Sequence, residues 1–383
     1  MAPYGSLEYF YLVAALAIPA LIGGFTGRRL KHYTMVVSVV MCVVLVSEFL
    51  VHMLWLGGFF VFEAILMKVY LRYRTGLDRE SARSAGAVWI ARGAAVAATV
   101  PLVITKMGAL FPSMSVGFLG ISYLSFKAIQ VILEITDGLI TEYRLLDYVG
   151  FIAFFPTMSS GPIDRSRRFT EDAERAWSRA EYSALLARGL GLLLLGAVYK
   201  FVLAGLCYGF VQAAPNAWAY MYAYSGQLFF DFAGYSAMAV GLSHVFGVRT
   251  PMNFRLPFAA ESIKEFWNRW HVTLSFWFRD YLYSRLVMWL IRRKTFKDRA
   301  WAGRLSMMIN MTLMGFWHGF TAHYILYGLY HGVLLVANDI FEKRSSFYQR
   351  HHKATWYRVL AILVTAHVVM FGFLLFSGHI IPV

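Results

Sequence analysis

Two histidines stand within or beside strongly apolar stretches of this chain, where an ionisable side chain is costly unless it serves a purpose. His271 ends the run Glu265-Phe-Trp-Asn-Arg-Trp-His271, and His318 lies in Phe316-Trp-His-Gly319. An imidazole with a near-neutral pKa is a suitable base for moving an acyl group onto a hydroxyl. By themselves, the residues predict a membrane site that handles protons.

Structural interpretations compete with this one. His318 would also be accommodated by hydrogen bonding to a neighbouring helix, with Gly315 and Gly319 allowing close helix packing. His271 would fit an interfacial aromatic belt in which Arg269 reaches the membrane surface. That belt explains the tryptophans and Arg269 but leaves Asn268 without a reason. The motif that ends at His271 therefore favours a functional role over a purely structural one.

Two other kinds of site are disfavoured. His323 and His331 follow His318, but no acidic residue lies between positions 318 and 331 and no His-Glu-x-x-His pattern occurs, so no metal is expected. The closest approaches to a Gly-x-Ser-x-Gly nucleophile, such as Gly120-Ile-Ser122, lack the closing glycine. Direct transfer without a covalent acyl-enzyme is favoured.

The composition predicts an all-α integral membrane protein. Of its 383 residues 59% are hydrophobic and only 15% charged, against about 25% charged in soluble domains. The apolar stretches run from end to end, which predicts one polytopic domain over residues 1–383. A spanning helix needs about 20 apolar residues. The candidates are 7–27, 34–51, 54–71, 86–106, 114–140, 185–212, 217–247, 305–320, 324–341 and 357–377, with shorter pieces at 148–160 and 272–291.

We therefore expect about eleven spans with one or two re-entrant or interfacial helices. The segment from Thr250 to Leu290 is too polar for an ordinary span and too apolar for a solvated loop. Pro251 and Pro257 prevent a continuous helix at its start. Irregular backbone at membrane depth is tolerated where it is buried or lines a wet cavity, so this segment is predicted to form a cavity wall.

The net charge of +15 follows the positive-inside pattern of membrane loops. Basic segments at 28–31, 68–83, 165–188, 292–304 and 343–358 are expected to face the cytoplasm, with the N-terminus outside. A docking surface for an acidic partner is the alternative reading of this charge. Nucleic acid is disfavoured because the charges are scattered over loops, and the widely separated Cys42 and Cys207 predict no disulfide.

Several motifs extend the histidine pattern. They are Gly161-Pro-Ile-Asp-Arg165 with Arg168-Phe169, Asp231-Phe-Ala-Gly-Tyr-Ser236, Asn253-Phe-Arg-Leu-Pro-Phe258, Glu265-Phe-Trp-Asn-Arg-Trp-His271, Phe278-Arg-Asp-Tyr281 and Gly315-Phe-Trp-His-Gly319. With them the sequence resembles the membrane-bound O-acyltransferase family (MBOAT) over roughly residues 145–335. It is most similar to the subgroup that transfers D-alanine to teichoic acid. The alginate O-acetylase subgroup is similar in outline but tends to have arginine where Asn268 stands.

The resemblance implies a ring of membrane helices around a central funnel in the bacterial cell membrane. It implies His318 as the catalytic base and His271 as its companion, with Trp267, Asn268, Arg269 and Trp317 binding or enclosing the substrate. The implied donor is a D-alanyl thioester on the phosphopantetheine arm of a small, acidic cytosolic carrier protein, so no covalently bound cofactor is expected. The implied acceptor is a teichoic acid hydroxyl outside, reached directly or through a further partner protein.

Two alternative functions remain open. One is O-acetylation of an exported polysaccharide, which differs from the first function only in the acyl group and acceptor. The other is a transporter of the acyl group without chemistry, because intramembrane histidines also serve proton relays. Transporters often carry inverted repeats with paired broken helices, and no such internal symmetry is evident in the sequence.

Overall fold

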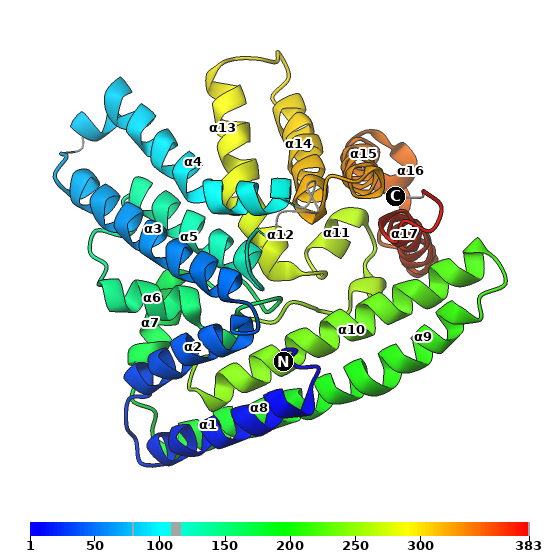
Figure 1. The fold of residues 1–383 in the computed structure, drawn as a ribbon. Coiled ribbons are helices and arrows are strands. Elements are labelled where there is room, and N and C mark those ends of the chain that lie inside the picture. Colours follow the sequence, from blue (N-terminus) through cyan, green and yellow to red (C-terminus); the bar gives the residue numbers. More distant parts are fainter. Residues whose placement is uncertain (79, 109–115, 382–383) are drawn as a thin grey trace. The chain divides into compact units, whose positions relative to one another are not determined.

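The computed structural model describes residues 1–78, 80–108 and 116–381, and helices dominate it (Figure 1). Residue contacts divide the chain into two compact units. Unit 1 comprises Met1–Leu195 and Tyr235–Pro251, and unit 2 comprises Gly196–Gly234 and Met252–Val383. The single domain expected over residues 1–383 stays a prediction.

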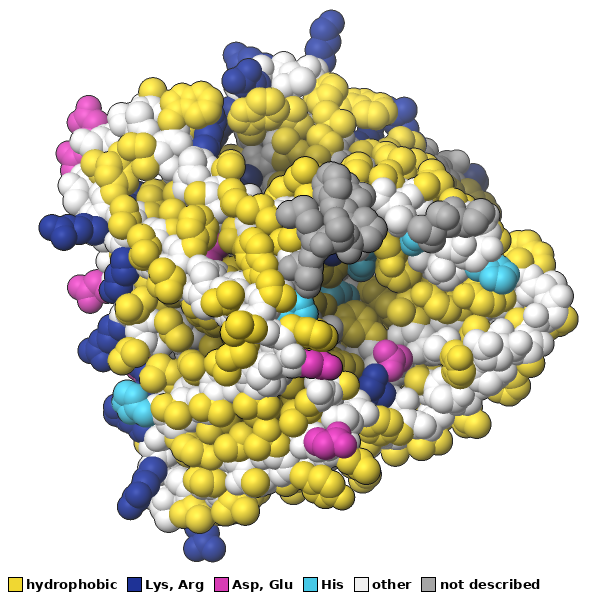
Figure 2. Space-filling model, in the orientation of Figure 1, with side chains coloured by type: hydrophobic (Ala, Val, Ile, Leu, Met, Phe, Trp, Pro, Cys, Tyr) yellow, Lys and Arg dark blue, Asp and Glu magenta, His cyan; other side chains and the backbone are white. Residues whose placement is uncertain are grey.

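Six helices in the described residues are long and apolar enough to cross a membrane: Leu7–Phe25, Leu50–Thr75, Ala85–Gly108, Arg179–Gln212, Ala322–Arg344 and Thr355–Phe376. At most 28% of the residues in their apolar windows are buried within the protein, as expected where lipid covers the remainder. Hydrophobic side chains also cover much of the face seen in Figure 2. The all-α membrane class is confirmed, whereas the count of about eleven spans stays a prediction. The first two residues of the expected span 114–140 lie outside the described residues.

Unit 1 contains the first seven helices and parts of two more. They are α1 (Leu7–Phe25), α2 (Lys31–Val46), α3 (Leu50–Thr75), α4 (Ala85–Gly108), α5 (Ile121–Thr136), α6 (Leu145–Ala153), α7 (Ser166–Glu174), most of α8 (Arg179–Ala197) and the end of α10 (Ala217–Val245). Glycines let α8 and α10 approach, because a Cβ on Gly241 would lie 2.5 Å from the carbonyl oxygen of Gly189. The hydroxyl of Tyr182 on α8 donates to the carbonyl of Val245 at 2.7 Å.

A buried lysine organises the turn after α6. Lys127 of α5 is 1% exposed, and its ammonium donates to the carbonyls of Phe151 and Ile152 at 3.2 and 3.4 Å and to the Thr157 hydroxyl at 3.1 Å. The last carbonyls of a helix have no intrahelical partner and lie at its partially negative end. Lys127 thus supports the turn that leads to the Gly161–Arg165 motif.

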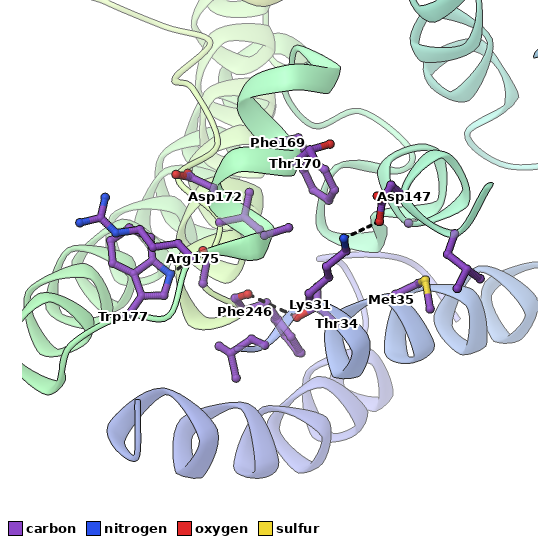
Figure 3. A pocket seen from close by; sticks show the side chains of 16 residues that line it. Lys31, Thr34, Met35, Asp147, Phe169, Thr170, Asp172, Arg175, Trp177 and Phe246 are labelled. Atoms are coloured by element: carbon purple, nitrogen blue, oxygen red, sulfur yellow. Dashed lines mark hydrogen bonds and ion pairs between the residues drawn. The ribbon is translucent and has the colours of Figure 1, made fainter. Parts of the chain in front are cut away.

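The basic segments of unit 1 meet at a polar end of that unit. Lys31, at the start of α2, forms ion pairs with Asp147 of α6 at 2.5 Å and Glu174 of α7 at 2.8 Å. Figure 3 shows Lys31 pointing toward Asp147 beside a cavity of about 470 Å³. Lys68 donates to the carbonyl of Tyr143 at 3.0 Å close by. This proximity agrees with a common membrane side for the segments 28–31, 68–83 and 165–188.

An ion-pair network lies at the same cavity. Asp172 of α7 accepts from the backbone N–H of Arg249 at 2.8 Å and from its guanidinium, and it also pairs with Arg168 at 3.3 Å. Burial by itself would raise the pKa of Asp172, but the hydrogen bonds and positive charges of the two arginines outweigh it and hold that pKa below its ordinary value. The network ties α7 to the loop after α10.

Unit 2 contains the remaining helices. They are a π-helical turn (Val198–Leu203), α9 (Ala204–Gln212), the first part of α10, α11 (Ile263–Trp267), α12 (Val272–Phe278), a second π-helical turn (Arg279–Tyr283), α13 (Ser284–Arg292), α14 (Ala300–His318), α15 (Ala322–Arg344), α16 (Ser346–His351) and α17 (Thr355–Phe376). α14 packs on α15, and α15 on α17 (Figure 1).

The contact between α14 and α15 depends on two glycines. A Cβ on Gly315 would lie 2.5 Å from the carbonyl oxygen of Tyr324, and one on Gly328 would lie 2.5 Å from that of Met311. Larger residues would push the backbones apart. The crossing therefore places the end of α14, which carries His318, directly beside α15.

The break predicted between Thr250 and Leu290 is confirmed. Pro257 begins a short 3₁₀ turn that ends at Ala259, and the short helices α11 and α12 follow with a break between them at residues 268–271. Because short helices leave their ends open to neighbours, this segment can turn several side chains toward one place. Trp267, Trp270 and His271 of this segment line a cavity of unit 2.

Candidate functional site

Both predicted histidines line one cavity of about 390 Å³ in unit 2. Its walls come from α10, α11, α12, α14, α15 and α17 and from the break before α12. The lining residues are Leu228, Phe232, Trp267, Trp270, His271, Leu274, Met314, His318, Tyr327, Phe373 and Phe376. The structure thus brings together two imidazoles that are far apart in the sequence, in surroundings that are otherwise aromatic and aliphatic.

His318 is the last residue of α14 and is partly exposed. Its ring centroid lies 4.9 Å from that of Phe376 on α17 and 6.2 Å from that of Tyr327 on α15, while Tyr324 stacks on it at 5.8 Å. The C-terminal end of a helix is partially negative and favours a positive charge nearby. The surroundings of His318 thus combine aromatic rings with the negative end of a helix.

His271 precedes α12 and has an unusual backbone. Its φ of 41° and ψ of 51° lie in the left-handed region, which costs a side chain other than glycine about 1–3 kcal/mol. The side chain is buried, with 4% exposed, and its ring meets that of Phe232 edge-on at 4.7 Å. Such backbone strain persists only where contacts with surrounding residues hold the backbone in place.

Asn253 provides some of these contacts. Its backbone carbonyl accepts from the N–H of Val272 at 2.9 Å, and its side-chain oxygen accepts from the N–H and hydroxyl of Thr273 at 3.3 and 2.6 Å. The N–H of Arg255 also donates to the carbonyl of Arg269 at 3.0 Å. The two chain segments are therefore paired on either side of His271. Asn253 was not predicted as a site residue, although it begins the motif Asn253–Phe258.

The four predicted substrate-binding residues occupy different places. Trp267 lines the cavity. Trp317 is adjacent to His318, with ring centroids 4.6 Å apart, but is not among the lining residues. The Arg269 guanidinium forms an ion pair with Glu265 at 2.6 Å, and Asn268 is exposed; neither lines the cavity. Their roles stay predictions.

Several cavity residues were not anticipated from the sequence. Phe232 follows Asp231 in a motif that was noted, but Asp231 itself forms an ion pair with Lys200 at 2.5 Å and it is Phe232 that lines the cavity. Tyr327, Phe373 and Phe376 lie in ordinary apolar spans. Nothing in the local sequence separates them from lipid-facing aromatics, because their orientation depends on the packing of α14, α15 and α17.

The arrangement suits proton transfer away from water. None of the described residues that line the cavity is acidic, so the two imidazoles are its basic groups. An apolar enclosure strengthens electrostatic interactions and excludes competing water. A proton donor that enters the cavity would therefore meet two imidazoles in largely apolar surroundings.

The model of the membrane-bound O-acyltransferase family matches residues 40–377. The chain belongs to this family. It is therefore a membrane-bound acyltransferase of the bacterial cell membrane.

Individual relatives differ in how much of the chain they share. The teichoic acid D-alanyltransferase of Bacillus subtilis (strain 168) is 40% identical, over 99% of this chain and 98% of its own length. The protein of the same name from Streptococcus thermophilus is 36% identical over 99% and 96% of the two chains. A probable alginate O-acetylase, AlgI of Pseudomonas aeruginosa, is 35% identical but covers 57% of this chain and 42% of its own.

Proposed function

We propose that this enzyme transfers D-alanine from a carrier-bound thioester to a hydroxyl of teichoic acid. The main support is the similarity to teichoic acid D-alanyltransferases over the whole length of the chain. A cavity lined by both histidines is consistent with this function. Relatives named as alginate O-acetylases align with little more than half of the chain. The full-length similarity therefore favours D-alanine as the acyl group.

In the proposed step, His318 accepts the proton of the acceptor hydroxyl while the hydroxyl oxygen attacks the thioester carbonyl. An ester C–O bond forms and the C–S bond breaks. The imidazolium of His318 then returns its proton to the leaving thiolate, so that charge and atoms balance. The position of His318 at the end of α14 supports this role, since the helix end favours the transient positive charge.

His271 and its neighbours position the reactants in this proposal. The strained backbone of His271, fixed through Asn253, directs a second imidazole into the same cavity. Trp267 and Trp317 limit the access of water, and Asn268 and Arg269 contact substrate outside the enclosed volume. Correct positioning is worth orders of magnitude in rate, so a rigid support is expected.

The donor in the proposal is the phosphopantetheine thioester of an acidic cytosolic carrier protein. The basic segments support this partner because they carry the excess positive charge on the expected cytoplasmic side. The acceptor approaches from the outer side, either directly or through a further partner protein. No prosthetic group bound to this chain is needed for the step.

Replacing the base tests the proposal. His318→Ala is expected to fold but to lose about 10²–10⁴-fold in D-alanyl transfer, the usual contribution of general-base catalysis. The assay is loss of carrier-bound D-[¹⁴C]alanine in the presence of lipoteichoic acid. His367→Ala is a matched control, because His367 bonds the Tyr222 hydroxyl at 2.8 Å and lies outside the cavity. A wild-type rate in His318→Ala would remove His318 from the mechanism.

The same assay separates the two alternatives. An O-acetyltransferase would consume acetyl thioester in preference to D-alanyl thioester. A transporter without chemistry would leave purified thioester intact whether or not His318 is present. Thioester loss that requires both His318 and acceptor distinguishes the proposed enzyme from both.

A further inference from the structure

D-Alanine differs from other short acyl groups in carrying a positive charge. An α-amino group has an ordinary pKa of about 7.7–8.0 and is mostly protonated at pH 7. A cation in an apolar enclosure is costly unless the protein compensates it. If the enzyme has the proposed function, some groups of the cavity must therefore bind this ammonium.

Carboxylates do not supply the compensation. None of the described lining residues is acidic. The two acidic side chains nearest in sequence to lining residues are engaged elsewhere: Asp231 pairs with Lys200 at 2.5 Å, and Glu265 pairs with Arg269 at 2.6 Å. What the cavity offers in quantity is aromatic rings, whose faces are partially negative and attract cations.

Covalent geometry limits which rings are eligible. The α-nitrogen lies about 2.5 Å from the reacting carbonyl carbon, given the ordinary bond lengths and angle. The attacking oxygen lies about 3–3.5 Å from that carbon and within hydrogen-bond reach of the base. The ammonium is therefore expected within about 9 Å of the imidazole nitrogen of His318 that acts as the base.

Phe376 and Tyr327 line the cavity, and each has a ring contact to His318. Their centroids are 4.9 and 6.2 Å from that of His318, and 5.1 Å from each other at an angle of 66°. A cation within about 6 Å of a ring centroid interacts significantly with its face. The end of α14 adds negative potential on the same side.

We infer that Phe376 and Tyr327 bind the ammonium of the D-alanyl group and so set the preference of the enzyme for an aminoacyl over a plain acyl donor. Propionyl is the matched competitor, because it has the same carbon chain without the amino group. An aromatic contact with the ammonium stabilises the D-alanyl group alone. The two rings are therefore specificity determinants rather than catalytic groups.

The test compares carrier protein loaded with D-alanyl or propionyl phosphopantetheine, using kcat/KM for each. Phe376→Leu and Tyr327→Leu are each expected to lower the D-alanyl to propionyl ratio by about twofold to thirtyfold, the range of a single cation–π contact. Phe371→Leu is the control, because Phe371 is on the same helix but packs against Tyr330 outside the cavity. Its ratio should equal that of the wild type.

A second measurement changes the size of the side chain very little. Phenylalanine with one, two or three ring fluorines at position 376 weakens the negative face of the ring stepwise while its shape is nearly kept. The logarithm of the D-alanyl to propionyl ratio should fall steadily with fluorine number. A flat series, or equal losses for both donors, overturns the role of Phe376. If such a result came with D-alanyl transfer that still required His318, the proposed function would stand; an enzyme that transfers no D-alanine overturns both.

Discussion

His271 illustrates how single residues make this site. Its left-handed backbone is unfavourable by itself, and the hydrogen bonds of Asn253 to the two residues that follow it help to maintain it. Asn253 is fully buried. A polar side chain in such a place is expected to have structural consequences well beyond its own contacts.

We predict that Asn253→Ala lowers stability by about 1–3 kcal/mol, because a buried acceptor of two hydrogen bonds is lost. It should also lower kcat while KM for the loaded carrier is unchanged, since His271 would be held less firmly by the remaining backbone hydrogen bonds. Thermal unfolding in detergent and steady-state kinetics check this. Thr273→Val removes the hydroxyl contact but keeps the backbone one, so a larger effect in this variant than in Asn253→Ala would contradict the assignment.

The helices contribute mainly by how closely they approach. Gly315 and Gly328 bring the backbones of α14 and α15 into contact, and this contact decides where His318 lies relative to Tyr327. The broken segment after residue 250 contributes in another way, because its short helices turn Trp267, Trp270 and His271 into one cavity. Continuous helices of the same composition would spread these side chains around their surfaces.

Gly328→Ala is therefore expected to lower both the unfolding temperature and the rate of transfer. The added Cβ would lie 2.5 Å from the carbonyl oxygen of Met311, so α14 and α15 must separate, at a typical cost of about 1–3 kcal/mol. Gly205→Ala in α9 provides the matched control, because a Cβ there meets nothing within 4 Å. That control should be neutral or more stable, by up to about 1 kcal/mol from helix propensity; equal losses in both variants would argue against the crossing.

The arrangement of the whole molecule in the membrane depends on which segments contact lipid and which contact water. Most residues in the apolar windows of its long helices are not buried within the protein, and the basic segments of unit 1 meet at one end of that unit. Positive charge tends to remain on the cytoplasmic side, so we expect this end of unit 1 to face the cytoplasm. The loop between α2 and α3 must then face outward.

This orientation can be tested with single cysteines. In a Cys207→Ser background, with Cys42 retained because it is 1% exposed, Ser47→Cys should react with a membrane-impermeant thiol reagent added to intact cells. Ser81→Cys, beyond the other end of α3, should react only after the cells are opened. Both serines are exposed, so access depends on the membrane. The reverse labelling pattern would invert the topology and place the carrier on the wrong side.

The sequence by itself determined the membrane class, the break after residue 250 and the family. Apolar runs, prolines and motif spacing are local properties of the sequence. Apolar runs and prolines act through lipid contact and backbone geometry, which do not depend on contacts with distant segments of the chain. The two histidines, first noticed as ionisable groups in apolar sequence, were also visible at that level.

Only the tertiary structure decided what surrounds them. Phe373 and Phe376 reach the cavity because α17 packs on α15, and Tyr327 does so because two glycines bring α15 against α14. Asn268 is exposed although its neighbour Trp267 is buried, since Asn268 caps the C-terminal end of α11 and successive side chains on a helix point about 100° apart. Which face meets a cavity is settled by contacts between distant segments, and no local pattern encodes those contacts.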